Sequence, residues 1–154
     1  MLLYLVQHAE AYSKEEDPAR DLTEKGRLDI ESVSHHLQRL NVQGNQIFHS
    51  GKTRAQSTAH VLALHLKPPG GSLEAPGLAP LDEPEIWADR INSLDENILL
   101  VGHLPHLGKL AALLMSGDKE KSVVNFQMGG AVRLQRMAPG QWAVDWMLVP
   151  EIIL

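Results

Sequence analysis

The chain has 154 residues, of which 44% are hydrophobic and 21% are charged, a composition typical of a globular protein with one sizeable core. We expect a single domain over residues 1–154. The formal net charge of -5 argues against broad binding to nucleic acid or to anionic membranes, because such binding needs clustered Lys and Arg. The sequence has no cysteine, which excludes disulfides, cysteine nucleophiles and thiolate metal sites.

The N-terminal residues do not resemble a targeting segment. MLLYLV is apolar, but it lacks a basic region and is too short for a signal sequence. No apolar run approaches the ~20 residues that cross a bilayer. We therefore expect a cytoplasmic protein whose partners include neither nucleic acid nor membrane.

The first half of the chain predicts two strands, each followed by a helix. Residues 2–7 are typical of a strand that is buried on both faces. A helix is expected within residues 22–41, with the hydroxyl of Thr23 capping its start. Residues 46–48 predict a short strand and residues 53–66 a second helix, which a Pro-Pro-Gly-Gly sequence closes.

The second half begins with a Pro-rich segment, residues 72–85, which predicts a strand followed by a long loop. A helix is expected at residues 84–94. Residues 97–102, NILLVG, form the clearest strand pattern in the chain. Pro105 is expected in the first turn of the next helix, which extends to residue 115, because its missing amide hydrogen costs nothing there.

The chain ends in two alternating segments, residues 129–137 and 141–149, with Pro139-Gly140 between them. This pattern predicts a β-hairpin. Strands that alternate with helices and end in a hairpin predict an α/β fold with three α/β/α layers, in which helices cover both faces of a mainly parallel central sheet.

Three side chains directly follow predicted strands. His8 follows the first strand, Arg54 in HSGKTRAQST follows the second, and His103 follows NILLVG. Because ligands of open α/β sheets collect outside the carboxyl ends of the strands, we expect these side chains to meet at one pocket. An imidazole, a guanidinium and a second imidazole suit a phosphoryl group.

Each of the three residue types has a role in phosphoryl chemistry. The guanidinium of Arg54 can bind two phosphoryl oxygens at once. The imidazole of His8 can accept the phosphoryl group directly, since a pKa of ~6.5 leaves it largely unprotonated at neutral pH. A backbone carbonyl that holds Nδ1–H would direct Nε2 toward phosphorus, while His103 can donate to an equatorial oxygen.

Four motifs resemble the histidine phosphatase superfamily, most closely its small SixA-type phosphohistidine phosphatases. They are QHAE, LTEKG, SGKTRAQST and VGHLPHLG, in the order and at the approximate spacing of that family, and they cover nearly the whole chain. The resemblance implies a phosphoglycerate mutase-like fold. It also implies that His8 is the nucleophile, that Arg54 and His103 bind the transferred group, and that no metal or organic cofactor is needed.

A phosphatase is the function that this resemblance implies: the phosphoryl group passes to His8 and then to water. The expected partner is the phosphorylated histidine of a signalling protein, such as a phosphotransfer domain. A small phosphorylated substrate is the alternative.

The family motif begins Arg-His-Gly, whereas this chain has Gln7-His8-Ala9. Gln7 would then bind phosphate as a neutral amide, which weakens each contact by about 1 kcal/mol and predicts roughly ten- to hundredfold weaker catalysis. Lys52 lies close enough in sequence to restore some charge. A phosphate-binding or regulatory module with little turnover is therefore a second interpretation.

A general acid is expected on the loop after the third strand, where relatives that cleave oxygen esters carry a carboxylate. Asp82, Glu83 and Glu85 lie there, and Glu83 is our choice. An imidazole leaving group, with a pKa of ~6.5, needs less help from an acid than an alkoxide does. A site without a well-placed acid would therefore favour phosphohistidine.

Two other interpretations of the motifs are weaker. Gly51-Lys52-Thr53 resembles the end of a P-loop, but the nearest earlier glycine, Gly44, is too distant. His103 and His106 could hold a metal together with His8 and a loop carboxylate, although packing is the simpler role for His106.

Overall fold

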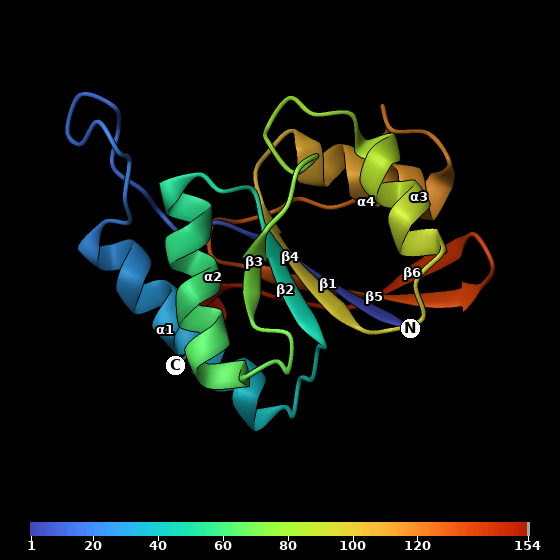
Figure 1. Ribbon diagram of the computed structural model, residues 1–154, viewed down its shortest axis with the longest axis horizontal. Helices are drawn as coiled ribbons and strands as arrows, with labels where there is room; N and C mark the ends of the chain where they lie inside the picture. The colour runs from blue at the N-terminus through green and yellow to red at the C-terminus, as the bar shows by residue number, and fades with distance from the viewer. Residues whose placement is uncertain (154) are drawn as a thin grey trace.

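A computed structural model describes residues 1–153 as one six-stranded sheet with helices on both faces (Figure 1). The strands are β1 (Leu2–Gln7), β2 (Gln46–His49), β3 (Ser72–Glu74), β4 (Ile98–Gly102), β5 (Ala131–Ala138) and β6 (Gln141–Leu148). The helices are α1 (Glu24–Arg39), α2 (Thr53–Leu66), α3 (Pro84–Asn92) and α4 (His106–Ser116), followed by the 3-10 helix η1 (Pro150–Ile152).

The strand order is β3-β2-β4-β1-β5-β6. The first four strands of that order run parallel to one another, whereas β5 is antiparallel to β1 and β6 is antiparallel to β5. The predicted three-layer α/β fold and the terminal hairpin are therefore confirmed. The order also places the carboxyl ends of β2, β4 and β1 side by side, which decides where the site can form.

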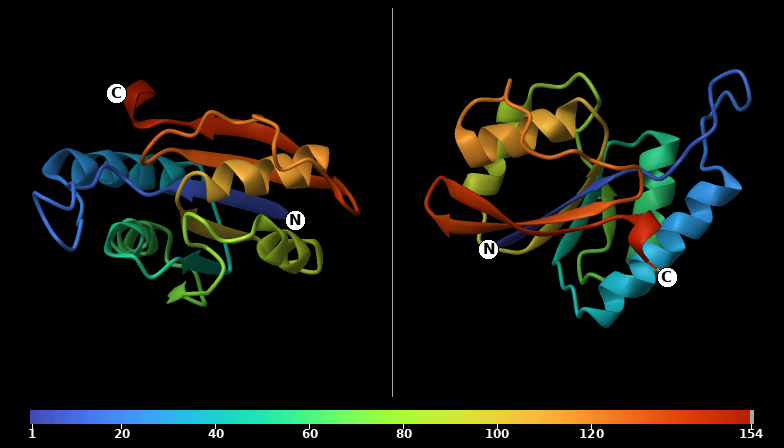
Figure 2. Two further views of the ribbon diagram at one scale, coloured as in Figure 1. Left: turned by 90° about the horizontal axis from the view of Figure 1, so that it is seen from above. Right: turned by 180° about the vertical axis from the view of Figure 1, so that it is seen from behind.

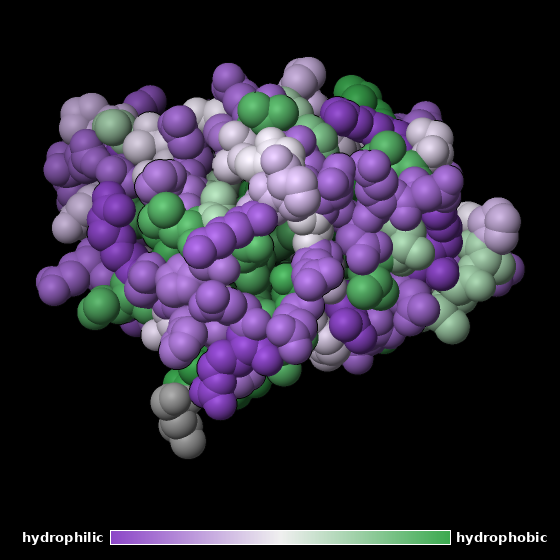
Figure 3. Space-filling view, turned by 60° about the horizontal axis from the view of Figure 1, so that its bottom comes forward, coloured by the Kyte–Doolittle hydropathy of each residue, from purple (hydrophilic) through white to green (hydrophobic). Residues whose placement is uncertain are grey.

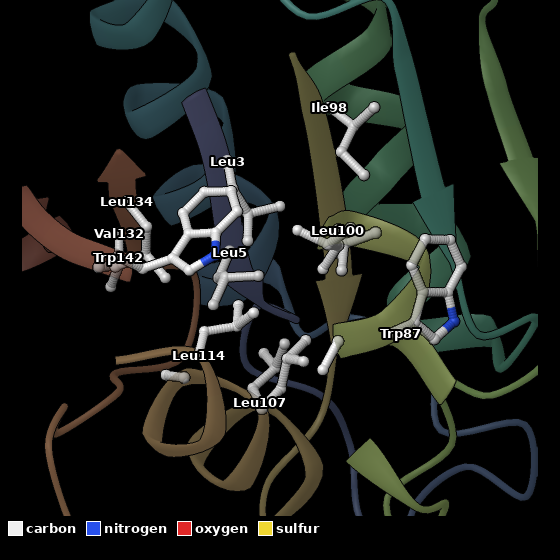
Figure 4. Close-up of a cluster of buried hydrophobic side chains, with 14 of the residues drawn as sticks. Leu3, Leu5, Trp87, Ile98, Leu100, Leu107, Leu114, Val132, Leu134 and Trp142 are labelled. Carbon is white, nitrogen blue, oxygen red and sulfur yellow. The ribbon is translucent and has the colours of Figure 1, made fainter. Parts of the chain in front are cut away.

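The helices lie in two pairs, α1 with α2 and α3 with α4, on opposite faces of the sheet (Figure 2). Alternate residues of β1 serve the two faces, because successive side chains of a strand point in opposite directions. Leu3 and Leu5 pack with α3 and α4, as Figure 4 shows, whereas Tyr4 and Val6 pack with α1 and α2. Each buried Leu contributes about 1.5–3 kcal/mol to stability. Packing on both faces therefore holds β1 in place, and with it the carboxyl end that carries His8.

The start of α1 is fastened to the segment that follows β1. The Thr23 hydroxyl accepts from the Gly26 amide at 3.0 Å, which confirms the predicted cap. The Thr23 amide donates to the carbonyl of Glu10. A Cβ atom on Gly26 would collide with that same carbonyl. Glycine in LTEKG therefore lets the helix approach QHAE closely and fixes the backbone beside His8.

Pro105 lies one position earlier than predicted. It precedes the first residue of α4 rather than occupying the first turn, and its carbonyl accepts the amide of Lys109 at 3.1 Å. A residue at that position needs no amide hydrogen, because only its carbonyl takes part in the helical hydrogen bonds. α4 therefore begins at His106, which points into the core.

The surface carries no broad apolar region on the face shown in Figure 3, where hydrophobic residues form small patches among hydrophilic ones. Scattered apolar residues of this kind are ordinary on protein surfaces. Within residues 1–153, none of the helices combines the length and the apolar character that crossing a membrane requires.

Candidate phosphoryl-transfer site

His8 and His103 lie side by side at the carboxyl ends of β1 and β4. These strands pair in parallel up to Gln7 and Gly102, and the His8 amide donates to the Gly102 carbonyl at 3.0 Å. The two imidazole rings, each one residue beyond its strand, have centroids 5.1 Å apart. Sheet register alone therefore brings together two histidines that are 95 positions apart in the sequence.

The ring of His8 is held in one tautomer. Its Nδ1 lies 2.8 Å from the carbonyl oxygen of Ala9. A carbonyl only accepts, so Nδ1 carries the proton and Nε2 keeps its lone pair. Burial lowers the pKa of His8 below its ordinary value, and the charges of Arg54 and Arg20 lower it further against the opposing effect of the Ala9 carbonyl. His8 is therefore neutral at pH 7, in the form that can attack phosphorus.

His103 is buried, with its side chain 2% exposed, and its Nε2 lies 2.6 Å from the Ser50 hydroxyl. Burial lowers its pKa to about 3, with further contributions from the charges of His8, Arg54 and Lys52. A neutral imidazole keeps one N–H group. His103 can donate a hydrogen bond to a phosphoryl oxygen, but it has no second proton to transfer.

Arg54 lies in the first turn of α2, directly after β2. After burial, its charge is one of the causes that lower the pKa of both histidines. The structure thus places His8 and His103 side by side and puts Arg54 among the charges that act on both rings. The charges acting on the histidine pair are all positive among residues 1–153, and the environment suits a dianion.

A second arginine, Arg20, joins the site, and the sequence did not reveal it. Its charge lowers the pKa of His8 and of Arg54. Arg20 has a positive φ of 53°, its amide donates to the Asp17 carbonyl, and its Nε donates to the Tyr12 carbonyl at 3.0 Å. These bonds hold a conformation that L-residues rarely adopt. The loop between β1 and α1 therefore holds Arg20 in a fixed conformation, from which its charge acts on His8.

Thr58 connects the two halves of the site. Its hydroxyl accepts from the Ala9 amide at 3.0 Å and donates to the Arg54 carbonyl at 2.8 Å. Thr58 is fully buried, and its bond with the Ala9 amide is shielded from water. Thr58, the last residue of SGKTRAQST, thereby ties the backbone beside His8 to the helix that carries Arg54.

Gln7 is largely buried, and its Oε1 has no hydrogen-bond partner among residues 1–153. A buried carbonyl oxygen without a partner costs about 1–3 kcal/mol. The position that holds arginine in the family motif is therefore occupied by an amide whose acceptor is unsatisfied. The positive charges that act on the pKa of the site histidines come from Arg54, Arg20 and Lys52 rather than from position 7.

Glu83 lies at the start of α3, and its carboxylate pairs with Lys119 at 3.2 Å, with the Glu83 side chain 71% exposed. Glu85 contacts the same ammonium at 2.7 Å. Asp82 accepts the Ala79 amide instead. The structure does not bring Glu83 to the histidine pair through any of these contacts, and its role as general acid stays a prediction.

Sequence comparison shows which protein the chain is related to. No protein family model matches the chain. An uncharacterized protein of Picosynechococcus sp. is 32% identical over 149 residues, which cover 88% of this chain and 89% of the relative. The chain belongs to the same family as that protein.

The solved structures that resemble the chain belong to the histidine phosphatase superfamily. The protein histidine phosphatase SixA, complexed with tungstate, has a TM-score of 0.87 and 21% identity, with 97% of both chains covered. The alpha-ribazole phosphatase of Shigella flexneri has a TM-score of 0.79 and 17% identity, again with 97% of both chains covered. The fold is the phosphoglycerate mutase-like fold of these proteins, as the motifs predict.

Two further histidines, His49 and His106, are buried. The Nδ1 of buried His49 accepts the Gly51 amide at 3.1 Å. His106 is fully buried, and neither ring nitrogen has a hydrogen-bond partner in the described chain. Among residues 1–153, no group of three or more His, Cys, Asp or Glu side chains is placed to hold a metal. The metal-site interpretation therefore lacks its ligand set.

The buried histidines predict that acid destabilises the protein. The pKa of His103 falls from an ordinary 6.5 to about 3 on folding. Protons therefore bind the unfolded chain first, and stability that is present above pH 6.5 is lost as the pH falls toward 3. At pH 5 the shifted pKa of this residue alone lowers the free energy of unfolding by about 2 kcal/mol relative to its value at high pH. Burial lowers the pKa of His8, His49 and His106 in the same direction.

Chemical denaturation at pH 7 and pH 5 checks this expectation. The free energy of unfolding should be at least about 2 kcal/mol lower at pH 5, and a His103→Asn variant should lose less between the same two values. Equal stability of the native protein at pH 7 and pH 5 would show that the histidines are not held neutral.

Proposed function

We propose that the protein is a phosphatase that transfers a phosphoryl group to Nε2 of His8 and then to water, and that its substrate is a protein phosphohistidine. One observation carries the proposal. The Ala9 carbonyl holds the Nδ1 proton of His8, beside a neutral His103 and within reach of the positive charge of Arg54. A fixed lone pair that faces concentrated positive charge is what nucleophilic attack on a phosphoryl dianion requires.

The first step forms one bond to phosphorus and breaks another. The Nε2 lone pair of His8 attacks phosphorus, and the P–N bond to the substrate imidazole breaks, with its electron pair returning to the substrate nitrogen. Arg54 and the N–H group of His103 stabilise the charge on the equatorial oxygens. A substrate imidazole whose other ring nitrogen carries a proton leaves as neutral imidazole, whose conjugate acid has a pKa of ~6.5, so no acid has to protonate the leaving nitrogen.

The second step regenerates the enzyme. Water attacks phosphorus, the P–N bond to His8 breaks, and the electron pair returns to Nε2 while the proton of the water passes to solvent. His8 then recovers the tautomer that the Ala9 carbonyl favours. The mechanism uses no group beyond the side chains already described.

The contacts of the loop carboxylates support phosphohistidine as the substrate. Among residues 1–153, the loop carboxylates Glu83 and Glu85 pair with Lys119 and Asp82 accepts the Ala79 amide, an arrangement that suits a leaving group with little need of an acid. Likeness to SixA, a protein histidine phosphatase, is consistent with this choice. Likeness to an alpha-ribazole phosphatase supports a small phosphoester as the second candidate.

Turnover of matched substrates tests the proposal. We expect the protein to hydrolyse an N-phosphohistidine peptide at least about a hundredfold faster than an alkyl phosphate, because only the alkoxide needs a general acid. Comparable rates on the two substrates would contradict the assignment to phosphohistidine. The absence of turnover on both would favour a phosphate-binding module.

Restoring a cation at position 7 should accelerate the reaction. Gln7→Arg replaces an amide whose oxygen is unsatisfied with a guanidinium, and a hydrogen bond to a charged donor is stronger by about 1 kcal/mol or more per contact. We expect kcat/KM to rise roughly ten- to hundredfold. Gln7→Met, which has similar volume and no charge, is the control and should give no gain. An unchanged rate in Gln7→Arg would place position 7 outside the phosphoryl site.

A further inference from the structure

Four cationic side chains line one pocket near the start of α2. Lys14, Arg20, Lys52 and Arg54 are among the residues around an open pocket of about 450 Å³, and the charges of Arg20, Lys52 and Arg54 act on the pKa of the histidine pair. None of the four pairs with a carboxylate in the part of the chain that the structure describes. Five other cations do form such ion pairs: Lys25, Arg27, Lys119, Arg133 and Arg136. In a protein with a net charge of -5, this concentration of free positive charge is a local feature.

The arrangement is unfavourable without an anion. Burial lowers the pKa of Arg54 and the charge of Arg20 lowers it further, so the two guanidinium groups repel each other. Lys52 caps the start of α2 without a side-chain hydrogen bond, and Arg54 follows in the first turn. The amino end of a helix carries partial positive charge, which disfavours cations there. A bound anion would relieve both repulsions.

A single phosphoryl group does not need all four cations. Arg54 and His103 are the residues expected to bind it beside His8. Lys14 and Lys52 are exposed, Arg20 is half-buried, and all three line the same pocket as Arg54. The pocket therefore carries more positive charge than one phosphoryl group requires.

The loop that supplies Arg20 is held in place before any ligand binds. Asp17 accepts the amides of Ala19, Arg20 and Asp21 through its side chain and its carbonyl. The Asp21 carboxylate in turn accepts the Ser57 hydroxyl of α2 at 2.8 Å. The loop and the helix are thus fastened to each other across the pocket, so the cations are preorganised.

We propose that Lys14, Arg20 and Lys52 bind a second anionic group of the substrate, adjacent to the phosphoryl group. The inference rests on the proposed function and narrows it to doubly anionic substrates. Carboxylates that flank a phosphohistidine would supply such a group. A second phosphoryl group on a small molecule has the same chemistry.

Two substrate pairs test the inference. The first is an N-phosphohistidine peptide flanked by glutamates against the same peptide flanked by alanines, and the second is an alkyl bisphosphate against the monophosphate. At low salt we expect kcat/KM to be at least about tenfold higher for the acidic peptide. The preference should shrink in about 0.5 M salt, where exposed charges are screened.

A matched pair of variants locates the effect. Lys52 and Lys67 lie at the two ends of the same helix, and Lys67 is at the end remote from the pocket. Lys52→Gln should reduce the preference for the acidic peptide several-fold, whereas Lys67→Gln removes the same charge and should not. Lys52→Gln should also keep or raise the melting temperature, because it removes a cation from the amino end of a helix.

Each outcome bears on the inference. A preference for the acidic peptide that depends on Lys52 supports the inference and identifies carboxylates as the second anionic group. A preference that depends on Lys52 but appears only with the bisphosphate supports the inference and identifies a second phosphoryl group instead. Equal rates within both pairs would overturn it. If no substrate turns over, the proposed function fails, and calorimetry decides the inference separately: pyrophosphate should bind at least about tenfold more tightly than orthophosphate, and equal affinities would overturn it.

Discussion

The His8→Asn variant is expected to lose at least about 10⁴-fold in turnover of an N-phosphohistidine peptide, the scale seen when an enzyme loses its nucleophile. Asparagine keeps a polar side chain at the carboxyl end of β1, but its amide nitrogen has no lone pair that can attack phosphorus. Steady-state release of phosphate measures the effect.

The same variant should still bind orthophosphate, because Arg54 and His103 are unchanged. Calorimetric titration with orthophosphate, together with the melting temperature, separates loss of the nucleophile from loss of the fold. Turnover that falls less than about tenfold in a folded His8→Asn protein would show that another residue accepts the phosphoryl group.

Arg54→Gln should produce the second largest effect, a loss of about 10²- to 10³-fold in kcat/KM. Glutamine cannot offer two charged N–H groups to the transferred phosphoryl oxygens. The charge of Arg54 also lowers the pKa of His8 and His103. Its removal should therefore raise both pKa values and move the acid limb of the pH profile of kcat/KM to higher pH.

The matched control for this change is Arg39→Gln. Arg39 is the exposed last residue of α1, and it is not among the charges that act on the histidine pair. The Arg39→Gln variant loses the same charge as Arg54→Gln, and it should change neither the rate nor the pH profile of kcat/KM. An Arg54→Gln protein with an unshifted acid limb would mean that the guanidinium does not face His8.

The sequence predicts much of the site because the strands themselves position it. Each of His8, Arg54 and His103 follows the carboxyl end of a strand within a few residues, and parallel pairing of neighbouring strands leaves little freedom in where those ends meet. The Thr23 cap and the hairpin around Pro139-Gly140 are predictable for a related reason, since each depends on residues that are close together in the chain.

The surroundings of Arg20 and Glu83 could not be predicted from the sequence. The direction of Arg20 depends on a positive φ and on bonds to Tyr12 and Asp17, which no local pattern in a charged loop reveals. The position of Glu83 on a loop predicts a general acid, but the partner of its carboxylate, Lys119, lies in the segment after α4. Contacts that are set by tertiary structure were therefore invisible in the sequence.

The most direct test of the account is to trap the phosphorylated enzyme. The protein is mixed briefly with a small phosphoramidate at neutral pH, quenched in alkali, which preserves phosphohistidine, and digested for mass spectrometry. We predict one phosphoryl group on the peptide that contains His8, and none in the His8→Asn variant. Turnover without any phosphorylated peptide, or with the phosphoryl group on another residue, would contradict the account.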